Sequence, residues 1–302
     1  MGLGGALALL AGARSLAIQR AWSCARGPPP FSIECGSQGT GLTGVRKEQA
    51  MNGSWTRIAT RVLLGVILAF AAPTAWAAPP VDRETHFRCY IVSQQTPQAA
   101  TTVTLSDQFL SKVALTVDEP LQFCAPVSKN GEPILEPEEH LTMYAAAAPL
   151  VDHLSIATED QFGPRILEAV GARVLLVPTQ KLEVEGVPTD LDFPTKLNHS
   201  WCYEVNGAPV DLEVTLRDQF RTDTVGVGQP TLFCNPVEKV VGGVTTRIEE
   251  RDVHLTCYDI KGPQRTRATH VLIENQFEQD TFTITSFELL CVPSEKKSFS
   301  PI

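Results

Sequence analysis

The sequence lacks the runs and motifs that mark several large classes of protein. The apolar run from Val62 to Ala72 ends at Pro73, well short of the ~20 residues that a membrane-spanning helix needs. The catalytic patterns GxSxG and HExxH and the phosphate-binding P-loop are all missing. "GVGQ" at Gly226 stands in no strand-to-helix dinucleotide pattern. We therefore predict a non-catalytic protein with no cofactor. We also predict that the mature chain, after removal of the signal peptide described below, has no stable membrane span.

Basic side chains are scarce in most of the chain. Residues 1–77 contain seven Arg or Lys and two Glu, whereas residues 78–302 contain 18 basic and 32 acidic side chains. Such an acidic surface repels phosphate backbones, and no basic patch is interleaved with aromatic residues. We therefore predict that nucleic acid is not a partner. With 43% apolar residues, the 302-residue chain has enough material for one or two folded domains.

Residues 51–77 have the three parts of a secretory signal peptide. "MNGSWTRIATR" is positively charged, the short apolar run follows, and Ala75-Trp76-Ala77 gives a small-x-small ending. The pattern predicts cleavage after Ala77 and a secreted or periplasmic product. A membrane-anchoring helix is the alternative, and the short run disfavours it.

Residues 1–50 precede this signal and show no sustained hydrophobic period. We interpret them as unstructured, and we hypothesise that translation starts at Met51. The alternative is a transit-like presequence, which their Arg-rich, acid-poor composition favours. Cys24 and Cys35 lie in this segment and are left out of the fold.

The remainder of the chain is an internal repeat of about 55 residues. Each of four units begins with His-x-x-Cys/Met-Tyr, continues to an Asp/Asn-Gln-Phe landmark, and ends near a Cys/Leu-x-Pro landmark. Units 1 to 4 begin at His86, His140, His199 and His254. The second landmark begins at Asp107, Asp160, Asp218 and Asn275, and the third at Cys124, Leu176, Cys234 and Cys291.

The cysteines of the repeat predict their own pairing. Unit 2 lacks both cysteines, with Met143 and Leu176 in their places, while every other unit keeps both. Pairing within units leaves no cysteine without a partner. Pairing between neighbouring units would leave some cysteines unpaired, because unit 2 has none to offer. Of the 15 pairings that six cysteines allow, this one predicts the disulfides Cys89–Cys124, Cys202–Cys234 and Cys257–Cys291. Disulfides also agree with export.

Alternating runs of Val, Thr, Leu, Ile and Phe predict about four short strands in each unit. The segment from Pro164 to Val177 is the best helical alternative, but Gly171 interrupts it and we expect two strands. We predict an all-β fold of tandem antiparallel β-sandwich domains, each built from two units packed sheet on sheet. Residues 79–196 would form the first sandwich and residues 197–302 the second. The alternative is an unbroken four-unit array.

The repeated polar residues favour roles in the fold. All four tyrosines, Tyr90, Tyr144, Tyr203 and Tyr258, follow the first cysteine position, and we expect each to pack under a loop with its hydroxyl bonded to backbone. Stacking on a sugar or a protein is the alternative. A catalytic residue is needed once per site, so recurrence of the histidines indicates a structural role.

Metal binding is the weaker interpretation of two landmarks. The Asp/Asn-Gln-Phe landmark suits a turn, because Asp and Asn side chains both bond nearby backbone. Calcium would need several oxygens converging in one loop, and His-x-x-Cys lacks the paired spacing typical of zinc sites. We predict no metal site.

The landmarks as a set resemble an uncharacterised family of exported bacterial repeat domains of unknown function. The resemblance rests on "HxxCY", "DQF" and the "FCAPVSK", "FCNPVEK" and "LCVPSEK" segments, and it covers residues 86–302. It implies a bacterial exported protein and no substrate. We expect a binding or structural protein of the cell envelope or extracellular space, whose partner is an unknown protein or glycan. The alternative is an exported hydrolase with an acidic site between the two sandwiches, built from Glu185, Asp190 and Asp192.

Overall fold

Antiparallel strands make up the fold throughout the residues that the computed structural model describes, which are 85–96, 100–264 and 267–302. The expected signal segment, the cleavage site after Ala77 and residues 1–50 lie outside them. No helix in this described part has the length and apolar character to cross a membrane.

Each repeat unit contributes several strands, which follow one another in chain order. Unit 1 provides β1 (Phe87–Gln94), β2 (Thr101–Ser106), β3 (Val113–Val117), β4 (Pro120–Pro126) and β5 (Ser128–Lys129). Unit 2 provides β6 (His140–Asp160), β7 (Gly163–Val184) and β8 (Val187–Pro188). Unit 3 provides β9 (Ser200–Asn206), β10 (Leu212–Arg217), β11 (Thr222–Pro236), β12 (Glu238–Val241) and β13 (Val244–Thr246). Unit 4 provides β14 (His254–Lys261), β15 (Thr269–Glu274) and β16 (Gln279–Pro301).

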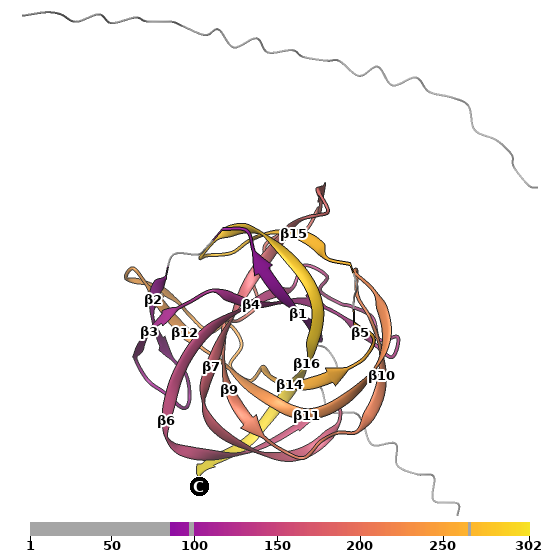
Figure 1. Ribbon diagram of the computed structural model, residues 1–302. Helices are drawn as coiled ribbons and strands as arrows, with labels where there is room; N and C mark the ends of the chain where they lie inside the picture. The colour runs from indigo at the N-terminus through magenta and orange to yellow at the C-terminus, as the bar shows by residue number, and fades with distance from the viewer. Residues whose placement is uncertain (1–84, 97–99, 265–266) are drawn as a thin grey trace, which may run out of the picture. The chain divides into compact units, whose positions relative to one another are not determined.

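Two strands from each unit join in a closed ring. Antiparallel pairing runs β1–β4–β6–β7–β9–β11–β14–β16 and returns from β16 to β1. Figure 1 looks along this ring, with its strands arranged around the outline. Closure leaves these strands without a free edge, so their backbone groups find partners on both sides.

The middle of each unit forms a hairpin arm outside the ring. The arms are β2–β3, the far ends of β6 and β7, β10 with the start of β11, and β15 with the start of β16. The Asp/Asn-Gln-Phe landmark forms the turn of each arm: in unit 1, Asp107 Oδ1 accepts hydrogen bonds from the Phe109 and Leu110 amides, both at 2.8 Å. The landmark is therefore the side-chain-capped turn predicted from the sequence.

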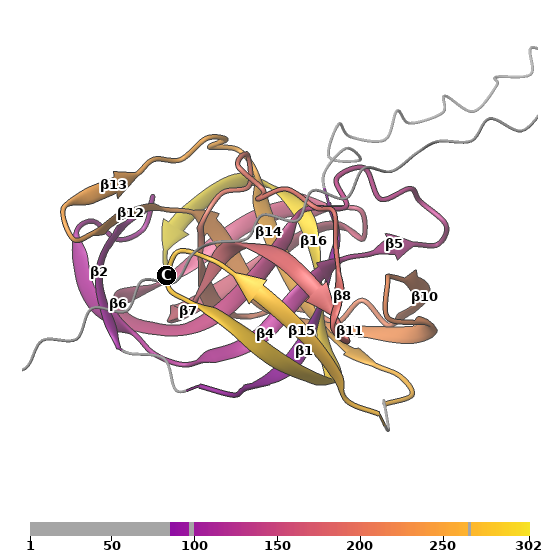
Figure 2. The same ribbon diagram turned by 90° about the horizontal axis from the view of Figure 1, so that it is seen from above.

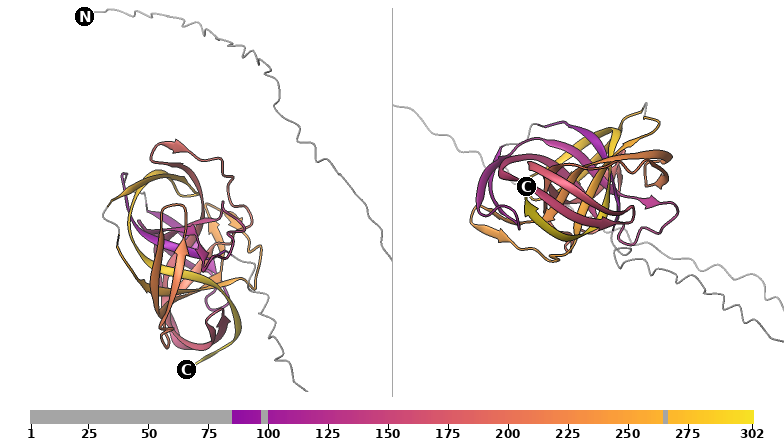
Figure 3. Two further views of the ribbon diagram at one scale, coloured as in Figure 1. Left: turned by 90° about the vertical axis from the view of Figure 1, so that its right-hand side faces the viewer. Right: turned by 90° about the horizontal axis from the view of Figure 1, so that it is seen from below.

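Each arm pairs with the tail of the unit two places away in the ring. β2 of unit 1 pairs with β12 of unit 3, and β10 of unit 3 pairs with β5 of unit 1. Likewise β6 of unit 2 pairs with the end of β16, and β15 of unit 4 pairs with the end of β7. Figure 2 shows β2, β12 and β13 on one side of the molecule and β5 and β10 on the other, and Figure 3 shows the C-terminal end of β16 beside the unit 2 strands. Opposite units are therefore interlocked in pairs, 1 with 3 and 2 with 4.

The long strands bend where they leave the ring for an arm. The register between β6 and β7 shifts between Ala145 and Ala148 and between Pro149 and Leu154, and the register between β7 and β9 shifts around Gly171. Such irregularities bend a strand and increase its twist. The segment from Pro164 to Val177 is thus extended as expected, but as part of one bent strand, β7.

Three clusters of buried side chains fill the molecule. The first lies inside the ring and contains all six paired cysteines with Met143 and Leu176. The other two lie outside the ring wall beneath the arms: one contains Tyr144 and Tyr203, and the other contains Tyr90 and Tyr258. Alternation along each ring strand explains the division, because the cysteine and the tyrosine that follows it point to opposite faces.

The all-β antiparallel prediction agrees with the structure, whereas the arrangement of domains differs from it. Residues 79–196 and 197–302 were expected to form two separate sandwiches. Strands from both segments instead join in the one closed ring, with β1 beside β16 and β7 beside β9, and both segments belong to one compact unit. The physical reason is the exchange of arms and tails between opposite units, which ties each half of the chain to the other.

Candidate functional site

The three disulfides lie in the wall of the ring and face its interior. They join Cys89 to Cys124, Cys202 to Cys234 and Cys257 to Cys291, which are the pairs predicted from the sequence. In each case the two cysteines are direct cross-strand neighbours, and Met143 and Leu176 face each other in the same way. Every one of these side chains is buried. The apolar pair therefore occupies the place of a fourth bridge.

Each of the four repeated tyrosines contacts the turn of the opposite unit. The Tyr90 hydroxyl donates to Asp218 at 2.6 Å, the Tyr203 hydroxyl donates to Asp107 at 2.9 Å, and the Tyr258 hydroxyl donates to Asp160. In unit 2 the Tyr144 hydroxyl donates to Glu278 at 2.6 Å and accepts from Asn275 at 2.8 Å.

The phenylalanine of each turn packs edge-on against the same tyrosine. The ring centroids of Phe109 and Tyr203 are 5.0 Å apart, and the other three pairs lie at 5.2 to 5.4 Å. Edge-to-face pairs at this separation stabilise a core beyond the burial of their area. The tyrosines thus pack under the turns as expected, but their hydroxyls bind side chains of another unit, where backbone partners were expected.

The repeated histidines bind glutamines of the turns. Gln219 Nε2 lies 3.2 Å from His140 Nε2, Gln108 Nε2 lies 3.4 Å from His254 Nε2, and Gln161 contacts His86. In every case the glutamine comes from the next unit around the ring, with unit 1 following unit 4. Because each contact holds an arm against the ring wall, the histidines belong to the scaffold.

A repeated lysine lies beside these histidines, five residues after each third landmark. Lys239 Nζ is 2.9 Å from His199 Nε2, and Lys181 binds Gln219. Burial, with the nearby Lys181 ammonium, lowers the pKa of His140 to about 3, and burial lowers the pKa of Lys239 to about 7. His140, His199 and His254, whose pKa values all fall to about 3 or 4, are therefore neutral at physiological pH.

A pocket opens at the end of the ring where the first strand of each unit begins. Its volume is about 430 Å³, within the range of small-molecule sites. Its floor includes the residue that follows each repeated histidine: Phe87, Leu141, Ser200 and Leu255. Because these four residues come from four strands around the ring, the pocket spans the ring opening, directly above the cystine-lined interior. We call it the end pocket.

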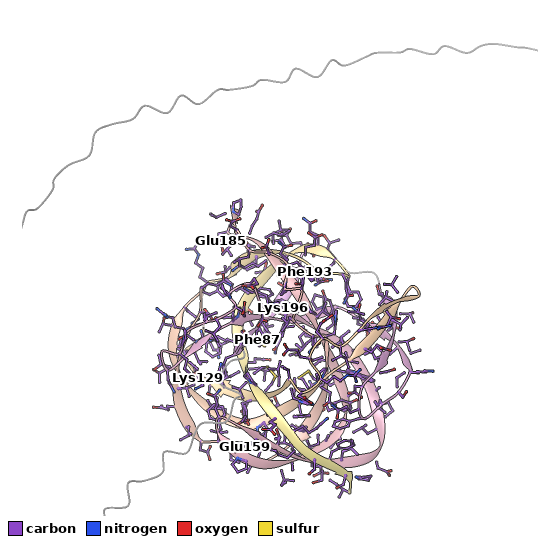
Figure 4. The ribbon with its side chains drawn as sticks, turned by 180° about the vertical axis from the view of Figure 1, so that it is seen from behind. Phe87, Lys129, Glu159, Glu185, Phe193 and Lys196 are labelled. Carbon is purple, nitrogen blue, oxygen red and sulfur yellow. A yellow bond between two sulfur atoms is a disulfide. The ribbon has the colours of Figure 1, made fainter. Side chains whose placement is uncertain are left out.

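The walls of the end pocket are the segments that connect the units. They comprise Thr85 before unit 1, then Glu136, Glu138 and Glu139 before unit 2, residues 192–198 before unit 3, and Glu250 with Val253 before unit 4. In the view of Figure 4, Phe87 lies near the centre of the ring, and Phe193 and Lys196 lie between it and the rim.

Hydrogen bonds fix these connecting segments to the ring and to one another. The His140 Nδ1 atom lies 3.0 Å from the Glu138 carbonyl oxygen, and the His254 Nδ1 atom lies 3.0 Å from that of Asp252. Asn198 joins two walls, because its Nδ2 donates to the Glu250 carbonyl at 2.6 Å and its Oδ1 accepts from the Glu249 amide at 2.8 Å. These hydrogen bonds thus fix the positions of the segments that form the walls of the pocket.

The charge of the end pocket is strongly negative. Five carboxylates line it, and Lys196 is the one cation among its lining residues; the carboxylates are Glu136, Glu138, Glu139, Asp192 and Glu250. Burial raises the pKa of Glu139, and repulsion from Glu136, Glu138 and Glu250 raises it further. The site therefore concentrates negative charge over an apolar floor.

The three carboxylates considered for a hydrolase do not come together. Asp192 lines the end pocket, Asp190 is exposed outside its lining, and Glu185 lies in the β7–β8 turn. There the Glu185 carboxylate accepts from the His270 amide at 2.9 Å. No group of three His, Cys, Asp or Glu side chains among the described residues is placed to hold a metal ion.

Sequence analysis did not single out Glu136, Glu138 or Glu139 as site residues. A signal was available, since "EPEEH" ends at His140 and "EERDVH" ends at His254, so both acidic stretches lead directly into first strands. The sequence alone does not show that these stretches lie together, because that depends on the first strands of the four units beginning at the same end of a ring.

Comparison with known proteins gives a family match for part of the chain. Residues 166–293 match the family model described as a repeat of unknown function (DUF7450). The match begins in β7 and ends just after Cys291, at the third landmark of unit 4. No curated protein and no solved structure matches the chain. Over these residues the chain is similar to an uncharacterised repeat.

Proposed function

We propose that the protein is an exported, non-catalytic binding protein of the cell envelope or extracellular space, and that the end pocket is its binding site. The observation that carries the proposal is a pocket of about 430 Å³ built on a disulfide-braced ring. Pockets of this kind, preformed and held by rigid elements, are typical of ligand-binding sites. The partner class is a protein segment or a glycan.

Export is supported by the redox chemistry of the interior. Three buried disulfides persist where the surroundings are oxidising, and the predicted signal peptide would deliver the chain there. N-terminal sequencing of the secreted product tests this part of the proposal. A first residue of Ala78 agrees with it, and a mature N-terminus before residue 60 contradicts it.

Binding is tested by filling the pocket. Thr195 is an exposed lining residue, so Thr195→Trp adds bulk inside the end pocket without disturbing the core. Thr102→Trp, at an exposed position on β2, is the matched control. Glycan and peptide arrays probed with the oxidised protein are expected to give a ligand that the Thr195 variant loses and the control keeps. Arrays without any ligand, or a ligand that both variants retain, would contradict the proposal.

An acidic hydrolase is the second candidate. Asp192 and Glu139 line the same pocket, and the raised pKa of Glu139 is the environment that a general acid requires. Hydrolysis of an array ligand during binding, abolished by Glu139→Gln, would favour this candidate. Recovery of the ligand unchanged would favour the binding protein.

A further inference from the structure

We infer that the end pocket binds a cation carried on an aliphatic stem, such as an alkylammonium ion or a lysine side chain. This inference rests on the proposed function and specifies its ligand. Three features of the pocket carry it: the balance of charge, the partnering of the carboxylates, and the separation of apolar floor from acidic wall.

The charge balance selects the sign of the ligand. Five carboxylates and one lysine line this single open pocket. Charges of one sign lining a cleft attract ligands of the opposite sign, and the low-dielectric walls strengthen that attraction. An anionic sugar or a nucleotide would meet repulsion from three of the four walls, since residues 136–139, 192–198 and 250–253 each contribute a carboxylate.

The carboxylates are not neutralised by the protein itself. Among the described residues, none of Glu136, Glu138, Glu139, Asp192 and Glu250 takes part in an ion pair, although eleven ion pairs occur elsewhere. Lys196 likewise forms none. By contrast, the buried carboxylate of Asp218 has Arg88 at 3.3 Å. The carboxylates of the pocket walls are thus available to form ion pairs with a bound cation.

Glu139 is a partly buried carboxylate of the pocket, beside other carboxylates. Its carboxyl group is partly withdrawn from water, and burial with repulsion from the neighbouring carboxylates raises its pKa. A cation that reaches this position relieves both the desolvation and the repulsion from the neighbouring glutamates. A neutral ligand relieves neither.

The apolar floor selects the shape of the ligand. Phe87, Leu141 and Leu255 close the bottom of the pocket, and Phe193 stands at its rim with 40% of its surface exposed. Lysine-like chains lay their methylene groups along apolar surface and keep the charged head among polar groups. The exposed Phe193 ring can also receive a cation on its face. A compact inorganic cation would use the walls and leave the floor unused.

Three probes with the same five-carbon chain test the inference. We expect 1,5-diaminopentane to bind the full oxidised protein, and 1,5-pentanediol and glutarate to bind at least about tenfold more weakly, by calorimetry at low salt. Backbone amide shifts are expected to concentrate in residues 85–87, 136–141, 192–200 and 250–255. Raising the salt concentration should weaken the binding.

Matched charge variants provide the control. The triple variant Glu136→Gln, Glu138→Gln, Glu250→Gln removes pocket charge without changing shape and should lose diamine binding by about tenfold or more. The triple variant Glu119→Gln, Glu213→Gln, Glu274→Gln removes the same charge from exposed positions outside the pocket and should bind as wild type. Equal losses in both variants would assign the effect to net charge and overturn the inference.

The outcomes separate this inference from the proposed function. If glutarate or a neutral glycan binds and Thr195→Trp blocks that binding, the inference of a cationic ligand is overturned, while the proposal that the end pocket binds a ligand stands. No binding of any probe at these residues would overturn both. A lysine tripeptide, acetyl-Gly-Lys-Gly-amide, identifies the source: tighter binding than the diamine indicates a protein segment, and weaker binding indicates a free amine. Either result supports the shared chemistry.

Discussion

Unit 2 differs from the other three units at a single place inside the ring, and the difference separates geometry from covalent bonding. Met143 faces Leu176 in the register that cysteines occupy in units 1, 3 and 4. All of these side chains are buried in one interior cluster. The ring therefore accommodates either a disulfide or an apolar pair, and the bridges add stability to a geometry that packing already specifies.

Removing a disulfide should have the largest effect on this comparison. The double variant Cys202→Ala, Cys234→Ala opens a loop of 32 residues, which is worth about 3 to 4 kcal/mol on the chain-entropy model, and it leaves a small cavity as well. We expect the free energy of unfolding in denaturant to fall by about 4 kcal/mol. Cys202→Met, Cys234→Leu reproduces the unit 2 pair and should lose less. Equal losses in both variants would mean that packing at this place contributes nothing.

Adding the missing bridge reverses the comparison. Met143→Cys, Leu176→Cys should form a fourth disulfide, because the two positions are direct cross-strand neighbours as in the other units. We expect a gain of about 3 kcal/mol or less in the free energy of unfolding. Peptide mapping without reduction checks the link, and free thiols at 143 and 176 in the folded protein would contradict the equivalence of the four units.

The tyrosine contacts distinguish unit 2 in a second way. Tyr258 bonds the buried Asp160, whereas Tyr144 bonds Asn275 and the partly exposed Glu278. Tyr258→Phe removes the hydroxyl that donates to Oδ2 of the buried Asp160 carboxylate, which costs about 1 to 3 kcal/mol. We expect Tyr144→Phe to cost less, because water can reach Glu278 and the buried group that loses its partner, the Asn275 amide, is neutral. Chemical denaturation of both variants checks the order, and a larger loss in Tyr144→Phe would contradict it.

Acid should destabilise the fold through the buried histidines His140 and His254. Burial, with neighbouring lysines, lowers the pKa of His140 to about 3 and of His254 to about 4. The unfolded chain binds protons below about pH 6.5 and the folded chain does not. Each histidine therefore removes about 1.4 kcal/mol of stability per pH unit as the pH falls from 6.5 towards its folded pKa.

A histidine variant isolates this effect. We expect the stability of His140→Gln to fall less steeply than that of the wild type between pH 6.5 and 4. The raised pKa values of Asp107 and Asp160 add stability as the pH falls, in the wild type and in the variant alike. The contribution of His140 is therefore the difference between the two curves of stability against pH. Parallel curves would show that His140 becomes protonated in the folded state.

The repeat pattern predicts local structure well and assembly poorly. The landmarks place the strands, the turns and the three bridges, because each of these depends on residues within one unit. Which units meet depends on the twist of the sheet and on the exchange of arms, and the pattern offers each tyrosine four equivalent turns. For the same reason the end pocket escapes prediction, since its walls come from connecting segments that share no landmark, such as 136–139 and 192–198.

The central claim is that the four units form one closed ring, which neither half of the chain can build alone. The most direct measurement is the amide NMR spectrum of residues 197–302 produced as an isolated fragment under oxidising conditions. Without β1, β7 and the arms of units 1 and 2, its strands lose their outer partners, and we predict the narrow amide dispersion of an unfolded chain. A well-dispersed spectrum with both disulfides formed would show that this half folds independently and would contradict the closed-ring account.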